Sequence, residues 1–263
     1  MAQTIEVLYT VDASLEAVNK RAAQYFVDGI RAAASARGKA RIAISGGNTP
    51  KHTFELLAAA PYRDQIPWDK LEIYWVDERC VAPDQPDSNY RMTRLAMLDH
   101  VPLKPEQVFR VLGELDPEEA AAKYEAAIRQ SFRLEGAEMP VFDLLALGMG
   151  PDGHTASLFP HTAGLHELMR IAIANHVVQK ESWRVTLTSP VINRARDVFF
   201  LIEGKDKVDA LKHVFLGAPD PEMYPSQLIR PASGRITLLL DSAAGAALPP
   251  PDKNGQGRLE ITR

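Results

Sequence analysis

The residues most able to do chemistry lie in a glycine-rich segment at positions 148–160, which reads Gly-Met-Gly-Pro-Asp-Gly-His-Thr-Ala-Ser-Leu-Phe-Pro. The apolar run Phe142–Leu147 precedes it and is typical of a buried strand. A loop at the carboxyl end of that strand would present Asp152 and His154. Because an imidazole titrates near neutral pH, His154 could act as a general base. The same pattern also fits a loop histidine that only bonds to backbone, so these residues alone leave its role open.

The spacing of Gly148, Gly150 and Gly153 also matches the G-x-G-x-x-G pattern of dinucleotide-binding turns. Two features argue against that interpretation. Pro151 and Asp152 interrupt the turn, and no acidic residue about 20 positions further on ends a following strand to hold a ribose. We therefore expect no dinucleotide cofactor.

A second segment has the composition of an anion-binding turn. The predicted strand Arg41–Ser45 is followed by two glycines, two small polar residues and Pro50, which favours a helix start. Glycines let backbone N–H groups point into a concavity, and a helix N-terminus offers free donors to a phosphate. A plain strand-to-helix turn capped by Thr49 explains the same residues equally well. The candidate anion-binding residues are Ser45, Gly46, Gly47, Asn48 and Thr49.

Charged residues stand near the ends of other predicted strands. Asp77 and Arg79 come directly after the run Glu72–Val76. Further along, Arg184 begins a short strand and Lys207 lies three residues after Gly204. Ligands of open α/β sheets bind beyond the carboxyl ends of the strands, so these side chains could contact a polar substrate. Charged residues at strand ends are more often solvated surface or local ion pairs, so this pattern is weak on its own.

Other chemistries lack their sequence signals. The chain has no G-x-S-x-G pattern of a serine hydrolase and no H-E-x-x-H pair for zinc. His161 and His166 are five residues apart, a spacing that does not place them on one face of a helix. We therefore expect no dedicated metal site.

Short β-type runs alternate with longer helical patterns along almost the whole chain, which predicts an α/β fold with a mostly parallel sheet and helices on both faces. The expected strands are Ile5–Tyr9, Arg41–Ser45, Glu72–Val76, Phe142–Leu147, Arg184–Thr188, Val198–Glu203 and Ile236–Leu240. The expected helices are Ala13–Ala36, Lys51–Ala60, Pro117–Leu134 and Lys205–Phe215. No repeat or long linker divides the chain, so we expect one domain over residues 1–247. Residues 248–263, with three prolines near their start, predict a mobile tail.

The composition excludes several classes of protein. Of 263 residues, 30 are Lys or Arg and 34 are Asp or Glu, a net charge of −4 that argues against a nucleic-acid-binding surface. The single Cys80 cannot form an internal disulfide, which suits a reducing cytoplasm. No basic start with an apolar block suggests a targeting signal, and no apolar run approaches the roughly 18 residues of a membrane span. The expectation is a soluble cytoplasmic protein; the oligomeric state stays open, and a monomer is compatible with the sequence.

Four blocks, taken in order, resemble the 6-phosphogluconolactonase family, and the match runs from about residue 5 to residue 241. Glucosamine-6-phosphate deaminases of the same superfamily share the Gly-x-Gly-x-Asp-Gly-His start but continue with Ile-Ala-Phe-Asn-Glu-Pro, whereas this chain continues with Thr-Ala-Ser-Leu-Phe-Pro. The blocks are Ser-Gly-Gly-x-Thr-Pro at 45–50, Asp-Glu-Arg at 77–79 with Ser-Asn at 88–89, the segment 148–160, and Arg-x-Thr-Leu at 184–187 with Gly-x-x-Lys at 204–207.

The resemblance implies a Rossmann-like α/β fold, no metal or cofactor, and hydrolysis of a sugar-phosphate lactone, 6-phosphogluconolactone, in the pentose phosphate pathway. It assigns His154 as the general base and Asp77 and Asp152 as residues that orient the substrate or the histidine. The turn at 45–49 becomes part of the sugar-phosphate site, where Asn48 replaces the more usual serine with another short polar side chain. The cationic wall of that site would be Arg79, Arg184 and Lys207.

Two alternatives remain. A sugar-phosphate isomerase or deaminase of the same fold needs a glutamate that is missing after His154. A non-enzymatic sugar-phosphate sensor would normally carry a helix-turn-helix segment, and no such segment or basic face is evident.

Overall fold

The computed structural model describes residues 4–262, in which eight strands form one sheet in the order β11-β1-β10-β9-β6-β2-β3-β5. All neighbouring pairs in this sheet are parallel except β1 with β11. The predicted Rossmann-like α/β fold with a mostly parallel sheet is confirmed. The strands are β1 (Thr4–Asp12), β2 (Ala40–Ile44), β3 (Leu71–Trp75), β5 (Val108–Phe109), β6 (Leu144–Leu147), β9 (Val198–Ile202), β10 (Arg235–Asp241) and β11 (Gln256–Thr262).

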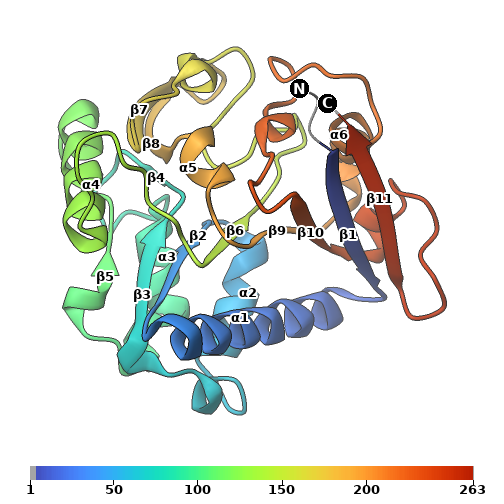
Figure 1. Cartoon of the computed structure of the whole chain (residues 1–263), viewed down its shortest axis with the longest axis horizontal. Helices are drawn as coiled ribbons and strands as arrows, with labels where there is room; N and C mark the ends of the chain where they lie inside the picture. The colour runs from blue at the N-terminus through green and yellow to red at the C-terminus, as the bar shows by residue number, and fades with distance from the viewer. Residues whose placement is uncertain (1–3, 263) are drawn as a thin grey trace.

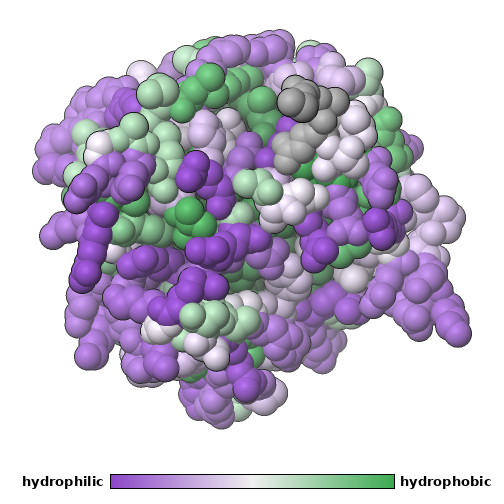
Figure 2. Space-filling model, in the orientation of Figure 1, coloured by the Kyte–Doolittle hydropathy of each residue, from purple (hydrophilic) through white to green (hydrophobic). Residues whose placement is uncertain are grey.

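Helices cover both faces of the sheet, because strands that are apolar on consecutive positions must be buried on both sides. Figure 1 shows α1 along the lower side of the view and α5 above the strands. Most of the surface in this orientation is hydrophilic, with small, scattered apolar areas (Figure 2). One face is covered by α1 (Leu15–Arg37), α2 (Asn48–Leu57) and α3 (Asn89–Ala96), and the other by α4 (Pro117–Phe132), α5 (Ser189–Asn193), α6 (Val208–Phe215) and α7 (Ser242–Gly245).

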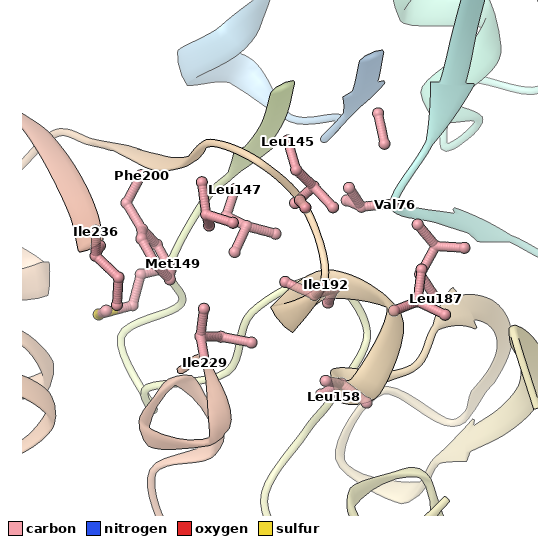
Figure 3. Close-up of a cluster of buried hydrophobic side chains, with 14 of the residues drawn as sticks. Val76, Leu145, Leu147, Met149, Leu158, Leu187, Ile192, Phe200, Ile229 and Ile236 are labelled. Atoms are coloured by element: carbon pink, nitrogen blue, oxygen red, sulfur yellow. The ribbon is translucent and has the colours of Figure 1, made fainter. Parts of the chain in front are cut away.

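The hydrophobic core continues from the sheet into the loop that follows β6. Leu145 and Leu147 of β6 share one buried cluster with Ile192 of α5 (Figure 3). Met149 and Leu158, on either side of the candidate histidine, belong to the same cluster, and Leu158 is fully buried. The loop that carries the histidine is therefore anchored to the core at both ends.

A second, three-stranded antiparallel sheet adjoins the main one at the end of β3. It consists of β4 (Asp77–Arg79), β8 (Ser182–Leu187) and β7 (Ala172–Val177), with β8 in the middle. The predicted strand Arg184–Thr188 is present as β8, but the sequence did not separate it from the parallel sheet. Its partners come from segments about 10 and 105 residues away in the chain, a pairing that local patterns do not specify.

Residues 256–262, inside the segment that the sequence predicted to be a mobile tail, form a strand. A turn closes where the Asp252 carboxylate accepts hydrogen bonds from the N–H groups of Asn254 and Gln256. The chain then returns as β11, antiparallel to β1, with Leu259 and Ile261 packed against the core cluster. Alternation of these apolar residues with polar ones is the strand signal that the preceding prolines obscured. Within residues 4–262, no helix is long and apolar enough to cross a membrane.

Candidate active site

A cavity of about 260 Å³ opens at the carboxyl ends of β2, β6 and β9. This is the edge of a parallel sheet where the loops after neighbouring strands meet. Every candidate site residue from the sequence lines it except Asp152, which contacts His154. The lining candidates are Ser45, Gly46, Gly47, Asn48, Thr49, Asp77, Arg79, His154, Arg184 and Lys207.

Asp152 fixes the orientation of the His154 ring. Its Oδ1 lies 2.5 Å from Nδ1 of the imidazole and also accepts the backbone N–H of His154 at 3.2 Å. Burial opposes ionisation of Asp152, but the hydrogen bonds and charge of His154 outweigh it and hold the pKa of the carboxyl below its ordinary value. The ionised carboxylate therefore accepts a proton carried on Nδ1, which leaves Nε2 as the basic nitrogen.

The glycines of this loop make room for the histidine. A Cβ on Gly150 would lie 2.0 Å from Nδ1 of His154, so any side chain there would displace the ring. Gly153 has a φ of 76°, in the left-handed region that favours glycine. Within residues 4–262, the hydrogen bonds of the imidazole itself involve only Nδ1. Nε2 of a residue that lines the cavity is thus free for a substrate or a water.

The turn after β2 is a helix start without a side-chain cap. Helix α2 begins at Asn48, and its N-cap residue is Gly47, which makes no side-chain hydrogen bond to the first turn. The alternative of a turn capped by Thr49 is therefore wrong. The hydroxyl of Ser45 donates to the carbonyl of Ala146 at 2.9 Å and joins the ends of β2 and β6. Asn48, Thr49 and Pro50 of the first turn line the cavity, and the N–H groups at a helix start suit an anion.

Two arginines lie side by side at the cavity wall. Arg79 of β4 and Arg184 of β8 are directly opposite in the antiparallel ladder. Neither forms an ion pair with a carboxylate of the described chain, and the buried Nε of Arg79 has no hydrogen-bond partner there. Burial, followed by the charge of Arg79, lowers the pKa of Arg184. Like charges opposite each other are destabilising, and an anion between them would relieve the repulsion.

The other predicted charges are already partly engaged. Lys207 Nζ lies 2.8 Å from Oδ2 of Asp206. The buried Asp77 accepts a hydrogen bond from the Ser157 hydroxyl at 2.6 Å, and so ties β4 to the histidine loop. Of the two aspartates, Asp152 contacts the imidazole and Asp77 contacts the loop that carries it.

The sequence of residues 13–238 matches the family described as glucosamine-6-phosphate isomerases/6-phosphogluconolactonase. The chain belongs to this family. It is 42% identical to a 6-phosphogluconolactonase of Synechocystis sp., a match that covers 95% of this chain and 100% of the relative. A 6-phosphogluconolactonase of Streptomyces coelicolor is 36% identical, over 89% of this chain and 92% of that protein.

Solved structures of the family share this fold. A 6-phosphogluconolactonase from Trypanosoma cruzi superposes with a TM-score of 0.80 at 31% identity, covering 91% of this chain and 96% of that one. A structure described as a monomeric glucosamine-6-phosphate deaminase superposes with a TM-score of 0.76 at 19% identity. The second likeness concerns the fold alone, so the lactonase and isomerase branches must be distinguished by other means.

Two further polar residues of the cavity had no site role predicted from the sequence, although Asn89 belongs to the Ser-Asn block at 88–89. Glu203, at the carboxyl end of a predicted strand, lines the cavity and accepts a 2.6 Å hydrogen bond from Asn19. Burial raises the pKa of Glu203. Asn89 also lines the cavity and donates to the carbonyl of Asp77 at 2.9 Å. The signal available for Glu203 was its position at a strand end, and the signal for Asn89 was its place in the Ser-Asn block. The contact of Asn89 with the glycine turn depends on the packing of α3 and was not predictable.

No group of three or more His, Cys, Asp or Glu side chains within residues 4–262 is arranged to hold a metal ion. The expectation that the protein works without metal or cofactor stays a prediction.

Proposed function

We propose that the protein hydrolyses 6-phosphogluconolactone to 6-phosphogluconate, as the names of its relatives suggest. The observation that carries the proposal is the cavity itself. It combines an Asp152-oriented His154 with a helix start that has no side-chain cap and two arginines that form no ion pair within residues 4–262. A phosphorylated lactone requires both a base for water and a site for a dianion.

The reaction begins with a water held near Nε2 of His154. The imidazole removes a proton as the water oxygen attacks the lactone carbonyl carbon, and negative charge develops on the carbonyl oxygen. The tetrahedral intermediate then collapses, the bond from the carbonyl carbon to the ring oxygen breaks, and the imidazolium returns its proton to that oxygen. Asp152 stabilises the imidazolium between these two steps.

The phosphate lies away from the reacting carbon and serves to hold the ring in place. Arg79 and Arg184 offer planar guanidinium groups that can each bind two phosphate oxygens, while the first turn of α2 offers N–H donors. Lys207, which lines the same cavity, adds a third cation. Binding energy from this remote group orients the lactone for attack.

The principal alternative is the isomerase or deaminase chemistry of the same family. That chemistry moves a proton between carbons and needs groups acting at two positions of the substrate. Glu167, the first acid after the histidine, accepts hydrogen bonds from the N–H groups of Met169 and Arg170 and is not part of the cavity wall. The carboxyls of Asp77 and Glu203 do line the cavity, each already in a hydrogen bond. Lactone hydrolysis needs one base acting on one water, and His154 can act as that base.

We expect acid release when the protein meets freshly made 6-phosphogluconolactone, above the spontaneous rate. We expect no ammonia from glucosamine 6-phosphate, and no exchange of the C2 proton of hexose 6-phosphates in deuterated solvent. Titration at constant pH and proton NMR measure these quantities. C2 exchange at a rate comparable to lactone hydrolysis would place the protein in the isomerase branch, and binding without any turnover would favour the sensor.

The oxidative pentose phosphate pathway and a cytoplasmic location complete the proposal. The pathway rests on the family resemblance, and the location rests on the cysteine content of the chain.

A further inference from the structure

The imidazole of His154 has a second neighbour that the reaction does not explain. Its ring is stacked on Phe159, with centroids 3.8 Å apart and planes at 17°. The guanidinium carbon of Arg184 lies 5.9 Å from the centroid of the same Phe159 ring. One phenyl ring therefore contacts both the base and a cation of the proposed phosphate site.

Phe159 is itself rigidly held. Its side chain is 2% exposed, and its carbonyl accepts hydrogen bonds from the N–H and hydroxyl of Thr162. The carbonyl of the next residue, Pro160, accepts from the side chain of Gln179 at 2.9 Å. The Thr162 hydroxyl also accepts from Asn175 of β7. These bonds tie the backbone at Phe159 to the small sheet that also carries Arg184.

The hydrogen bond from Nδ1 to Asp152 fixes only one point of the imidazole. Rotation of the ring about its bond to Cβ is limited by a contact on its face, which the stacked phenyl provides. For Arg184, the electron-rich face of an aromatic ring attracts a guanidinium and limits its rotamers. Small errors in the placement of reacting groups lower rates strongly.

We propose that Phe159 is a positioning residue, which sets the plane of the His154 imidazole for proton transfer and aims the Arg184 guanidinium at the phosphate. This inference rests on the proposed roles of His154 and Arg184. It predicts that a variant without the phenyl ring has a lower kcat, because the imidazole contact is lost. The same variant should have a higher KM, because the guanidinium contact is lost.

The test compares Phe159→Leu, which removes the ring, with Phe159→Tyr, which keeps it. We expect Phe159→Leu to lower kcat on the order of tenfold or more and to raise KM for the phosphorylated lactone. Phe159→Tyr should stay near wild type in both constants. In NMR spectra, the Cε1 proton of His154 should move downfield in Phe159→Leu, because the ring current of the stacked phenyl is lost, and remain in place in Phe159→Tyr.

A matched control separates positioning from stability. Phe142 is fully buried and packs against the rings of Phe132 and Tyr74, outside the cavity wall. Phe142→Leu should lower the melting temperature but leave kcat and the His154 resonance unchanged. If Phe159→Leu does not fold, Phe159→Met replaces it as the ring-free variant.

A Phe159→Leu enzyme with wild-type kcat and an unmoved His154 resonance would overturn the inference. So would a loss of kcat in Phe142→Leu as large as that in Phe159→Leu. The histidine variant distinguishes the two levels of the account. If His154→Ala is inactive while Phe159→Leu is normal, only the role of Phe159 fails. If His154→Ala turns over normally, the role of His154 as the base fails, and the inference with it. If the wild-type protein does not hydrolyse the lactone, the proposed function itself fails.

Discussion

Replacing His154 with alanine or glutamine is expected to lower kcat on the order of 10²–10⁴-fold. The loss falls on kcat because a general base acts mainly in the transition state, while the arginines and the turn after β2 still bind the substrate. 6-Phosphogluconate should therefore bind the variants with nearly unchanged affinity. Initial rates of acid release at saturating lactone, corrected for spontaneous hydrolysis, measure the effect.

The matched control is His100→Gln. His100 is an exposed histidine outside the cavity wall whose ring bonds to the carbonyl of Leu95, so its removal should leave kcat unchanged. Near-normal turnover of His154→Ala would rule out this residue as the base. An increase in KM with an unchanged kcat would instead make His154 a binding residue.

Removing the phosphate from the substrate is expected to have the second large effect. Unphosphorylated δ-gluconolactone should have a much lower kcat/KM, because the binding energy of the phosphate no longer orients the ring. Arg184→Met should lower kcat/KM for the phosphorylated lactone about 10- to 100-fold, since charge-assisted hydrogen bonds contribute about 1.5–3 kcal/mol. The same variant should change kcat/KM for δ-gluconolactone little. Steady-state kinetics measure kcat/KM for the wild type and for Arg184→Met, each with both lactones.

Protein stability provides a second readout for the arginine pair. Arg184 lies opposite Arg79 and has no ion-pair partner among residues 4–262, so Arg184→Met should not lower the melting temperature in the absence of ligand. Arg63→Met, at an exposed arginine paired with Asp64, serves as the control with unchanged kinetics. Equal kcat/KM for the two lactones in the wild type would show that the cavity does not recognise phosphate.

The sequence located the candidate site because three of its segments follow strands that are neighbours in the sheet. β6, β2 and β3 are adjacent and parallel, so their carboxyl ends bring the segments 148–154, 45–49 and 77–79 to one edge. For these segments, a strand pattern followed by glycines or charges was enough to predict that they lie at the same edge of the sheet, because the geometry of a parallel sheet is regular.

Features that depend on distant pairing were not predictable in the same way. The opposition of Arg79 and Arg184 arises from the antiparallel register of β4 and β8, which lie about 105 residues apart in the sequence. The stacking of Phe159 on the imidazole depends on side-chain packing within the loop. The final strand β11 was missed because proline and glycine near residues 249–257 outweighed a short alternating pattern at the end of the chain.

The claim that the neutral imidazole of His154 is the base is tested most directly by the acid limb of the pH–rate profile. The pKa of Asp152 is held below its ordinary value by the bonds and charge of His154 against the effect of burial, so this carboxyl stays ionised as the imidazole protonates. Protonation of the imidazole alone should then remove activity as the pH falls.

The measurement records kcat/KM for 6-phosphogluconolactone against pH and, in the same free protein, the NMR titration of the His154 Cε1 proton. The account predicts that kcat/KM falls with a slope of about one in log–log form and that its midpoint coincides with the midpoint of the NMR titration. A rate that is independent of pH through that titration, or a midpoint that belongs to another group, would contradict it.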